Sequence, residues 1–337
     1  METVTGVPVK YVNDVQDVMH GVSSQADPID EGKKRLLITR YKGRMLKRCP
    51  GTPNVICCNY FILNPVVGCP FDCTYCALQV YFTNPIITLY ANIDDLFDEL
   101  NERLRRKPRW LFRIGTGELT DSLTLDDVTR MSTLLVPYFA DKTGVLFELK
   151  TKSNTIIHLL DLDHGGRTVV AWSLNPQRII DRDEAGTASL GERLEAAHLC
   201  QEAGYRIAFH FDPLIHYEGW EKDYSDVIRR LFERIDPRAV VWISLGTFRF
   251  PPRLKPIIKQ RFPNTKIIYE EFVPGQDGKM RYLKPVRVDM YSKMLSWIRR
   301  HDTQLFVYLC MESTDIWQKV FGWTPETSAG LARMFHP

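Results

Sequence analysis

The feature that most constrains this chain is a short loop with three cysteines, residues 68–76. Cys69, Cys73 and Cys76 follow one another at C-x3-C-x2-C spacing, soon after the apolar run 60–63. Thiolates at this spacing can converge on one soft metal centre. A 4Fe–4S cluster held by three thiolates keeps one iron open, and an open iron can chelate the amino and carboxylate groups of S-adenosylmethionine (SAM). The spacing therefore favours an open-site cluster that supports radical chemistry with SAM.

A zinc site is the main alternative for these cysteines. Structural zinc sites usually take four ligands, often as paired C-x2-C units, and the sequence holds no second C-x2-C unit. Cys49, Cys57 or Cys58 could still supply a fourth thiolate. Otherwise we expect these three, like Cys200 and Cys310, to be small buried hydrophobic residues. Disulfides are not expected, because eight cysteines in 337 residues without a signal peptide indicate a reducing compartment.

Length and composition are those of an ordinary globular chain. The 337 residues suffice for one large α/β domain with appendages or for two domains, and 44% are hydrophobic and 25% charged. No apolar run reaches the roughly 18 residues of a membrane span, and the N-terminus has no signal-peptide pattern. We therefore expect a cytoplasmic protein. The net charge of +3 is too small to indicate nucleic-acid binding by itself.

Strand and helix patterns alternate along the chain after the cysteine loop. Six short apolar segments are expected to be strands, each followed by a helical segment such as 125–139 or 156–160: 60–63, 110–114, 145–149, 168–174, 205–211 and 240–245. This order predicts an α/β fold whose parallel sheet curls toward a barrel, with functional groups at the carboxyl ends of the strands. We divide the chain into a basic N-terminal segment (1–55), the barrel (56–248) and a C-terminal extension (249–337).

Two basic segments could contact nucleic acid. Residues 33–48 contain eight Lys or Arg residues and no Asp or Glu, so they could lie along a phosphate backbone or form a solvated basic face. Residues 266–272 and 280–288 are expected to pair as a hairpin with several cations and one aromatic ring: Lys279, Arg281, Tyr282, Lys284 and Arg287. Such a hairpin suits insertion between bases, and a surface hairpin with solvated charges is the alternative.

Polar residues at the expected strand ends are candidates for binding SAM. Gly117 and Glu118 follow the second strand, where a glycine permits close backbone approach and a carboxylate can accept hydrogen bonds from the SAM ammonium. Lys152, after the third strand, could pair with the SAM carboxylate. Ser173 and Asn175, at the end of the fourth strand, could hydrogen-bond the ribose or the carboxylate. The alternative for each is an ordinary surface or packing residue.

Tyr75 lies between two of the three loop cysteines. Its ring must therefore lie near the cluster or the SAM site. We consider Tyr75, together with Glu118, a candidate catalytic residue. His210 and His216 alternate with apolar positions near the fifth strand, a pattern more typical of packed histidines than of catalytic ones.

With these residues in view, the chain resembles the spore photoproduct lyase family of radical SAM DNA-repair enzymes. The resemblance runs from about residue 61 to residue 294 and includes the cysteine loop, residues 88–95, 151–152, 158–160, 173–175, 186–187, 193–197, 218–220 and 249–250, and the hairpin near residue 281. The three-cysteine motif marks radical SAM enzymes in general. The Glu218-Gly219-Trp220 segment and the hairpin point to this particular family.

The resemblance implies a partial (β/α)6 TIM-type barrel with a C-terminal hairpin extension, and a 4Fe–4S cluster on the three loop cysteines. In the family, SAM is cleaved to a 5′-deoxyadenosyl radical, which abstracts a hydrogen atom from the thymine dimer called spore photoproduct and so restores two thymines. Lys152 and Ser173 match positions that contact SAM. Arg281 and Tyr282 match the hairpin that wedges into the DNA lesion, and Lys284 is a further candidate contact. DNA and an electron donor such as a flavodoxin or ferredoxin are the implied partners.

The chain departs from the family pattern at two positions. Family members carry a cysteine shortly after the second strand that returns a hydrogen atom to the product radical, and the aligned residue here is Glu118. They also carry a tyrosine directly after the third cluster cysteine, where this chain has Ala77. A carboxylate is no hydrogen-atom donor, so Glu118 is better suited to binding SAM. Lesion repair is therefore the leading hypothesis. A radical SAM enzyme with another substrate and a non-enzymatic metal-binding DNA protein are the alternatives.

Overall fold

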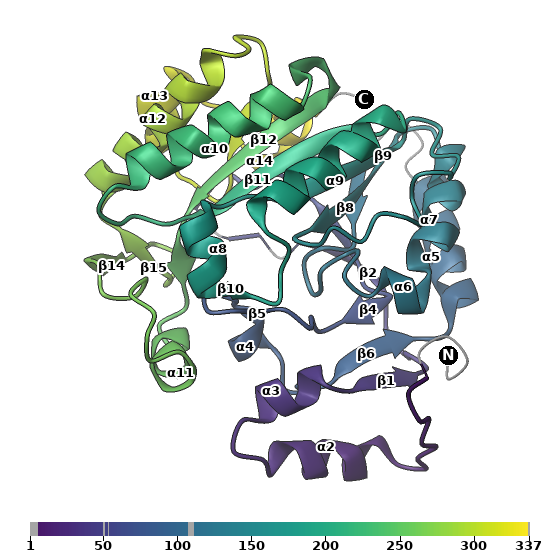
Figure 1. The fold of residues 1–337 in the computed structure, drawn as a ribbon. Helices are drawn as coiled ribbons and strands as arrows, with labels where there is room; N and C mark the ends of the chain where they lie inside the picture. Colours follow the sequence, from purple (N-terminus) through teal and green to yellow (C-terminus); the bar gives the residue numbers. More distant parts are fainter. Residues whose placement is uncertain (1–5, 50, 53, 107–110, 336–337) are drawn as a thin grey trace.

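The computed structural model describes residues 6–49, 51–52, 54–106 and 111–335, and its centre is one curled sheet (Figure 1). Eight strands lie in the order β16-β12-β11-β9-β8-β7-β3-β2. Seven of them are parallel to one another: β3 (Phe61–Leu63), β7 (Phe112–Gly115), β8 (Val145–Thr151), β9 (Thr168–Ser173), β11 (Arg206–Leu214), β12 (Val240–Thr247) and β16 (Val307–Leu309). Only β2 (Leu46–Arg48) is antiparallel, against β3. The predicted α/β fold with a curled parallel sheet is confirmed.

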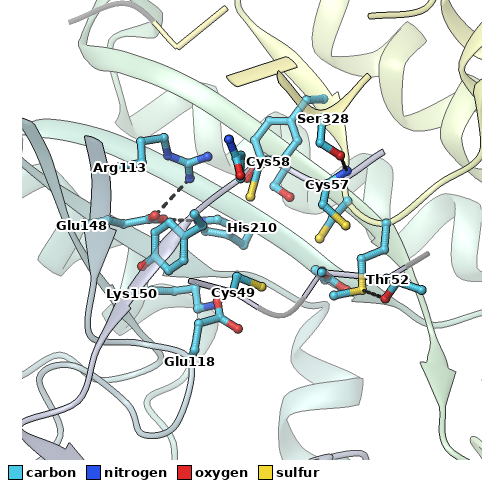
Figure 2. A pocket seen from close by; sticks show the side chains of 18 of the residues that line it. Cys49, Thr52, Cys57, Cys58, Arg113, Glu118, Glu148, Lys150, His210 and Ser328 are labelled. Carbon is cyan, nitrogen blue, oxygen red and sulfur yellow. Dashed lines mark hydrogen bonds and ion pairs between the residues drawn. The ribbon is translucent and has the colours of Figure 1, made fainter. Parts of the chain in front are cut away.

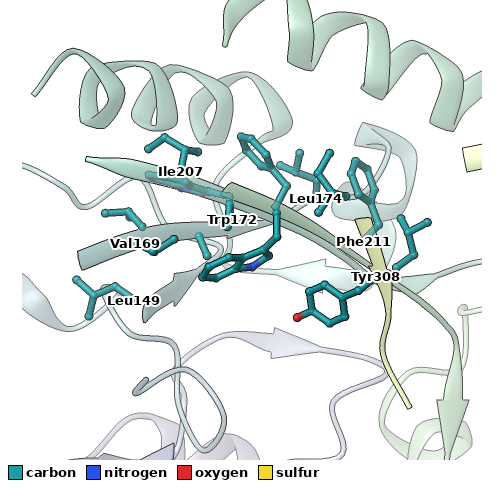
Figure 3. Packing of buried hydrophobic residues seen from close by; sticks show 14 of the residues in the cluster. Leu149, Val169, Trp172, Leu174, Ile207, Phe211 and Tyr308 are labelled. Carbon is teal, nitrogen blue, oxygen red and sulfur yellow. The ribbon is translucent and has the colours of Figure 1, made fainter. Parts of the chain in front are cut away.

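The strands form because both faces of this sheet are covered. All six residues of β9 are buried, and β8 is buried at every position but one. Such near-continuous apolar runs are typical of parallel strands between two layers. The hydrophobic core contains the side chains in Figure 3, among them Val169, Trp172, Ile207 and Phe211.

Helices cover the outer face of the curled sheet (Figure 1). The main ones are α5 (Ile93–Arg106), α7 (Met131–Ala140), α9 (Leu190–Glu202), α10 (Trp220–Arg234) and α12 (Lys284–Arg299). Their local sequences explain where they start and what they bury. Ser189 and Glu192 form a capping box at the start of α9, and α5 buries Leu96 and Leu100 while its basic residues gather at the end. In the part of the chain that the structure describes, no helix is long and apolar enough to cross a membrane.

Shorter elements surround this centre. At the N-terminal side, α2 (Val15–Ser23) and α3 (Pro28–Lys33) lie beside a small sheet of β1 (Leu36–Thr39), β6 (Ile87–Tyr90) and β4 (Val66–Val67). The remaining elements are β5 (Asp72–Cys73), α4 (Leu78–Tyr81), α6 (Asp126–Thr129), α8 (Gln177–Asp183), β10 (Glu184–Ala185), η1 (Pro237–Ala239), β13 (Arg249–Phe250), α11 (Leu254–Arg261), β14 (Phe272–Pro274), β15 (Met280–Tyr282), α13 (Thr314–Phe321) and α14 (Ser328–Ala332).

Three predicted elements differ in the structure. The helix expected over 125–139 is divided into α6 and α7, because Arg130 between them is left-handed with φ 50°. Residues 156–160 form turns rather than a helix. The expected strand 266–272 is reduced to β14, and the returning strand ends at Tyr282 because α12 begins with Lys284-Pro285, a residue pair suited to a helix start. Lys284 and Arg287 therefore lie on α12 and not on the hairpin.

The segments outside residues 56–248 are joined to the barrel. The N-terminal segment supplies β2 and the C-terminal extension supplies β16, so both contribute strands to the central sheet. The domain boundaries at residues 55 and 248 stay a prediction. Part of the basic segment 33–48 is paired with acids from outside that segment: Lys33 with Asp72, and Arg40 with Asp95 at 3.0 Å.

Candidate active site

The three-cysteine loop lies at the carboxyl end of β3 and is held against β10. Cys73 belongs to β5 and stands opposite Glu184 in an antiparallel pair. Cys73 is buried, and Cys69 and Cys76 are half-buried. Among the described residues, no three His, Cys, Asp or Glu side chains are placed to share one metal ion. The binding of a cluster by these three thiols remains a prediction.

Side chains from distant segments fix the backbone of this loop. The amide of Gln79 donates to the carbonyl oxygens of Thr74 at 3.1 Å and Cys76 at 3.3 Å. Arg261, on α11, donates to Gln79 at 2.5 Å and to both carboxylate oxygens of Asp72 at 3.1 Å. These contacts use the backbone and the polar side chains of the loop, so the loop is held in place without using the sulfur atoms.

Burial governs the protonation of the loop thiols. It raises the pKa of Cys69 to about 12 and the pKa of Cys73 well above its ordinary value, although the nearby Lys152 ammonium opposes the rise at Cys73. Both sulfurs are therefore thiols until a metal displaces their protons. A cationic residue so near the loop is also suited to an anionic ligand beside the cluster.

Tyr75 belongs to a buried polar network that the sequence did not reveal. Its hydroxyl donates to Glu184, which also accepts from Asn175 at 2.8 Å and from Arg193 at 2.6 Å. The side chains of Glu184 and Arg193 are both 0% exposed. Burial opposes ionisation of Glu184, but the charges of Arg193 and Lys152 outweigh it and lower its pKa to about 2. The network links the cluster loop to the end of β9.

The predicted SAM residues have definite places in this arrangement. Lys152 Nζ lies 5.6 Å from the centre of the Tyr75 ring, so its charge is close to the cysteine loop. Asn175 accepts from the Tyr224 hydroxyl at 2.7 Å besides donating to Glu184, so its amide has protein partners on both sides. Ser173 is buried at the end of β9, and its carbonyl oxygen accepts from Arg193 at 2.8 Å. The binding of SAM by these residues remains a prediction.

Gly117 and Glu118 face β8. A Cβ on Gly117 would lie 2.6 Å from Cβ of Lys150, so only glycine fits between the two segments. Glu118 forms an ion pair with Lys150 at 2.6 Å, and the Glu118 side chain is 36% exposed. Its carboxylate therefore has a cationic partner within the protein. The roles of Gly117 and Glu118 in binding SAM or in catalysis remain predictions. In the structure, Gly117 packs against Lys150, and Glu118 forms an ion pair with the same residue.

A cavity of about 480 Å³ occupies the barrel next to Glu118 and Lys150 (Figure 2). Deeper in the barrel it is lined by Arg113, Glu148 and His210, one from each of β7, β8 and β11. Glu148 lies 3.1 Å from Arg113 and 2.6 Å from His210. Burial opposes ionisation of Glu148, but the charges of Arg113 and His210 lower its pKa to about 2. The cavity thus has a charged interior, and the expectation that His210 is only a packing residue was incomplete.

The sequence contained a weak signal for these buried charges. Arg113 and Glu148 interrupt apolar strand segments, and Arg193 follows the apolar spacing of Leu190 and Leu194 on α9. A charged residue at a position whose period requires an apolar one indicates a buried ion pair. The pattern does not identify the partner, because Arg113 and Glu148 are 35 residues apart.

The hairpin residues Arg281 and Tyr282 are more buried than side chains that insert into DNA need to be. Arg281 is ion-paired with Asp277 at 2.6 Å, with side-chain exposures of 5% and 2%. Tyr282 is 1% exposed, and its hydroxyl accepts from the backbone of His216. Lys284 is half-exposed and paired with Asp315. Contact of these three residues with DNA remains a prediction, and in this conformation Lys284 is the most accessible of them.

A family model described as "Spore photoproduct lyase" matches residues 56–300. The spore photoproduct lyases of Bacillus subtilis (strain 168) and Geobacillus sp. (strain Y412MC61) are 30% and 28% identical over 211 and 207 residues, which is 60% of this chain in both cases. Those matches span about 60% of the length of each relative. The spore photoproduct lyase of Clostridium acetobutylicum is 24% identical over 285 residues, 83% of this chain and 79% of that protein.

Solved structures have the same fold. A spore photoproduct lyase complexed with dinucleoside spore photoproduct has a TM-score of 0.75 at 24% identity, with 84% of each chain covered. A double mutant with bound AdoMet and dinucleoside spore photoproduct gives the same TM-score, identity and coverage. The similarity extends over most of both chains and includes the curled parallel sheet.

Proposed function

This chain belongs to the spore photoproduct lyase family, and from that premise we propose that it is a radical SAM enzyme that repairs a UV-induced thymine dimer in DNA. The family's cofactors are a 4Fe–4S cluster and SAM. The observation that carries the proposal is the family match over residues 56–300, which includes the three-cysteine loop and every predicted SAM contact. Reductive cleavage of SAM, followed by hydrogen abstraction from the lesion, is the proposed reaction.

The proposed roles of the residues follow from their positions. Cys69, Cys73 and Cys76 would hold the cluster, which with SAM supplies a radical able to abstract hydrogen. Lys152 would pair with the carboxylate of SAM, since its charge lies near the cysteine loop. Ser173, at the end of β9, would hydrogen-bond SAM. Tyr75, anchored by Glu184, would shape the site between cluster and substrate.

The proposal includes the partners of the reaction. Damaged DNA would be the substrate, contacted by Arg281, Tyr282 and Lys284. The bound state of the first two requires the hairpin to open, because both are buried in this conformation. A low-potential donor such as a flavodoxin or ferredoxin would supply the electron. Such a reaction belongs in the reducing cytoplasm.

A specific observation favours a second candidate, a radical SAM reaction on another substrate. The position where the family has its hydrogen-donor cysteine carries Glu118, and this carboxylate is ion-paired with Lys150 at 2.6 Å. Ala77 replaces the family tyrosine. A site without this relay is suited to a substrate whose radical obtains its hydrogen elsewhere, such as a different nucleic-acid lesion or modified base.

The test is a turnover assay without oxygen. Reconstituted protein is given dithionite, SAM and dinucleotide spore photoproduct, and 5′-deoxyadenosine and thymine monomers are quantified, with Cys73→Ala as the inactive control. Lesion repair predicts both products. Deoxyadenosine without thymine overturns the lesion assignment and supports the second candidate. No deoxyadenosine from protein with a full cluster overturns both.

A Glu118→Cys variant sharpens the result, because it restores a thiol where the family has one. If the lesion is the substrate, this variant should raise the yield of clean thymine relative to adducts. A Glu118→Ala variant is the matched control, since it removes the carboxylate without adding a thiol. Equal product patterns from the two variants would argue against a hydrogen-donor role at this position.

A further inference from the structure

Four cysteines outside the three-cysteine loop line one cavity in the barrel. They are Cys49, Cys57 and Cys58, which Figure 2 labels, and Cys310. They come from three places in the chain: Cys49 follows β2, the Cys57-Cys58 pair precedes β3, and Cys310 follows β16. Together with the loop cysteines and Cys200, which α9 buries, they account for all eight cysteines. We will call these four the cavity cysteines.

The cavity cysteines were expected to be packing residues or, in part, a fourth ligand for the loop. Instead they are close enough to influence one another's ionisation. Burial raises the pKa of Cys49 to about 11, and repulsion from Cys58 and Cys57 adds to the rise. Burial also raises the pKa of Cys310, and the same two thiols contribute there. All four side chains line the same cavity, and this shared lining is what places them together.

A second observation points to a ligand in this cavity. Three buried side chains that line it have hydrogen-bonding atoms without a partner among the described residues: Nε and Nη1 of Arg113, the hydroxyl of Tyr60 and the hydroxyl of Ser244. Arg113 is 5%, Tyr60 4% and Ser244 0% exposed. A buried donor without an acceptor costs about 1–3 kcal/mol. An acceptor-rich group in the cavity would remove that cost.

The polar groups around the cavity fit an acceptor-rich group. The three acidic residues of the cavity are already paired, Glu118 with Lys150, Glu148 with Arg113 and His210, and Asp212 with Arg249. Arg249 also donates to the sulfur of Cys310 at 3.5 Å. Backbone amides of Gly51 and Thr52 donate hydrogen bonds to the sulfurs of Cys49 and Cys57, respectively. Each hydrogen bond opposes the rise in pKa that burial causes. The donors that remain unsatisfied are those of Arg113, Tyr60 and Ser244.

We propose that Cys49, Cys57, Cys58 and Cys310 hold a second iron–sulfur cluster, of the 4Fe–4S type, in the barrel cavity. Four thiolates complete the ligand set of such a cluster, one for each iron. Its sulfur atoms would accept hydrogen bonds from Arg113 and Tyr60. Binding releases the thiol protons and requires no oxidation of the cysteines.

A single zinc ion is the alternative for these four thiolates. Among the described residues, no three Cys, His, Asp or Glu side chains are placed to share one ion, and this holds for the loop cysteines as well. This placement therefore does not separate zinc from a cluster, whereas the metal content of the reconstituted protein does. The raised pKa values are also common to both groups and therefore do not separate them.

The test compares three variants with the wild type after anaerobic reconstitution with iron and sulfide. One variant replaces the loop cysteines (Cys69→Ala, Cys73→Ala and Cys76→Ala), and another replaces the cavity cysteines (Cys49→Ala, Cys57→Ala, Cys58→Ala and Cys310→Ala). Cys200→Ala is the matched control. Wild type and control should bind about 8 iron atoms per chain and each multiple variant about 4, since each cluster contains four.

The loop variant is decisive because its cavity is intact, and circular dichroism establishes that it is folded. A brown loop variant with about 4 iron atoms and a cluster signal in its paramagnetic resonance spectrum after reduction supports the proposal. A folded loop variant that holds no iron, or that holds zinc instead, overturns it. If the cavity variant does not fold, Cys310→Ala replaces it, and unchanged iron content in that variant also counts against the proposal.

This inference goes beyond the proposed function, and the two can fail separately. Wild-type protein with two clusters that never cleaves SAM would sink the proposed function and leave the second cluster in place. Wild-type protein that cleaves SAM but binds only about 4 iron atoms would overturn the second cluster and leave the proposed function in place.

Discussion

Two buried arginine–glutamate pairs, Arg193–Glu184 and Arg113–Glu148, differ in how completely the arginine is hydrogen-bonded. All three nitrogens of Arg193 have partners: the carbonyl oxygens of Ala188 and Ser173 at 2.8 Å, and Glu184 and Thr187 at 2.6 Å. Arg113 makes one hydrogen bond, to Glu148 at 3.1 Å, and its Nε and Nη1 have no partner among the described residues. Both carboxylates nevertheless have a pKa of about 2.

The difference shows in which pair every nitrogen of the arginine has a hydrogen-bond partner; we call that pair complete and the other incomplete. Arg193 ties α9, β9 and β10 together behind the cysteine loop, and nothing further is needed to satisfy it. Arg113 instead lies between aromatic rings, 3.9 Å from the centre of Phe335 and 4.5 Å from that of Trp242, with donors facing an open cavity. A buried polar group left unsatisfied in this way is a reason to expect a ligand. Similar pKa values therefore do not imply similar roles.

The largest expected effect comes from breaking the complete pair. Arg193→Met leaves Glu184 buried without its cation and should lower the free energy of unfolding by about 3–5 kcal/mol. Urea unfolding followed by circular dichroism measures this. Arg229→Met is the matched control, because Arg229 is an exposed helix residue, with 55% of its side chain accessible. A loss at Arg193 no larger than that at Arg229 would contradict a structural role for the network.

The second prediction concerns pH. The pKa of Glu184 is lowered to about 2 in the folded protein, below its value in the unfolded chain, so the carboxylate adds stability above about pH 4.5 and loses it as the pH falls toward 2. The stability of the wild type relative to Glu184→Gln should fall by about 3 kcal/mol in total as the pH is lowered from 7 to below 2. Unfolding curves between pH 3 and pH 7 test it. A difference that stays constant with pH would mean that the charge of Glu184 is not what stabilises the fold.

A smaller effect is expected from Arg113→Met. His210 remains in hydrogen-bond contact with Glu148 at 2.6 Å, and the substitution also removes the unpartnered nitrogens. The cost should be about 1–2 kcal/mol, below that of Arg193→Met. The same urea titration measures both variants. If the two costs are equal, the distinction between the complete and incomplete pairs is wrong.

The smallest effect on stability is expected at the exposed ion pair of Lys284 and Asp315, whose side chains are each 49% exposed. Lys284→Ala should change the free energy of unfolding by less than about 0.5 kcal/mol. If Lys284 contacts a DNA phosphate, the variant should also bind DNA more weakly and lower the salt dependence of log K by about 1. Fluorescence anisotropy over a salt series measures this, and Asp315→Ala is the control that removes the partner but keeps the cation. An unchanged salt slope would remove Lys284 from the proposed DNA interface.

Much of this molecule could be predicted from local pattern. The loop of Cys69, Cys73 and Cys76 was identified by its spacing alone, and five of the six predicted strands coincide with β7, β8, β9, β11 and β12, while the run 60–63 contains β3. The predicted strand 110–114 begins at residue 110, which lies outside the residues that the structure describes. Where local pattern failed, a backbone detail was responsible, such as the left-handed Arg130 that divides the helix expected over 125–139.

The sequence by itself determined the order of strands and helices and the three-cysteine loop, because spacing, hydrophobic period and capping act over a few residues. The tertiary structure decided which distant groups meet. Parallel pairing of β7 with β8 brings Arg113 to Glu148, and the pairing of β16 with β12 brings Cys310 to the cavity that Cys49 and Cys57 line. These long-range contacts depend on strand register and sheet curvature. Both arise from the packing of the whole chain, so no local sequence pattern predicts them.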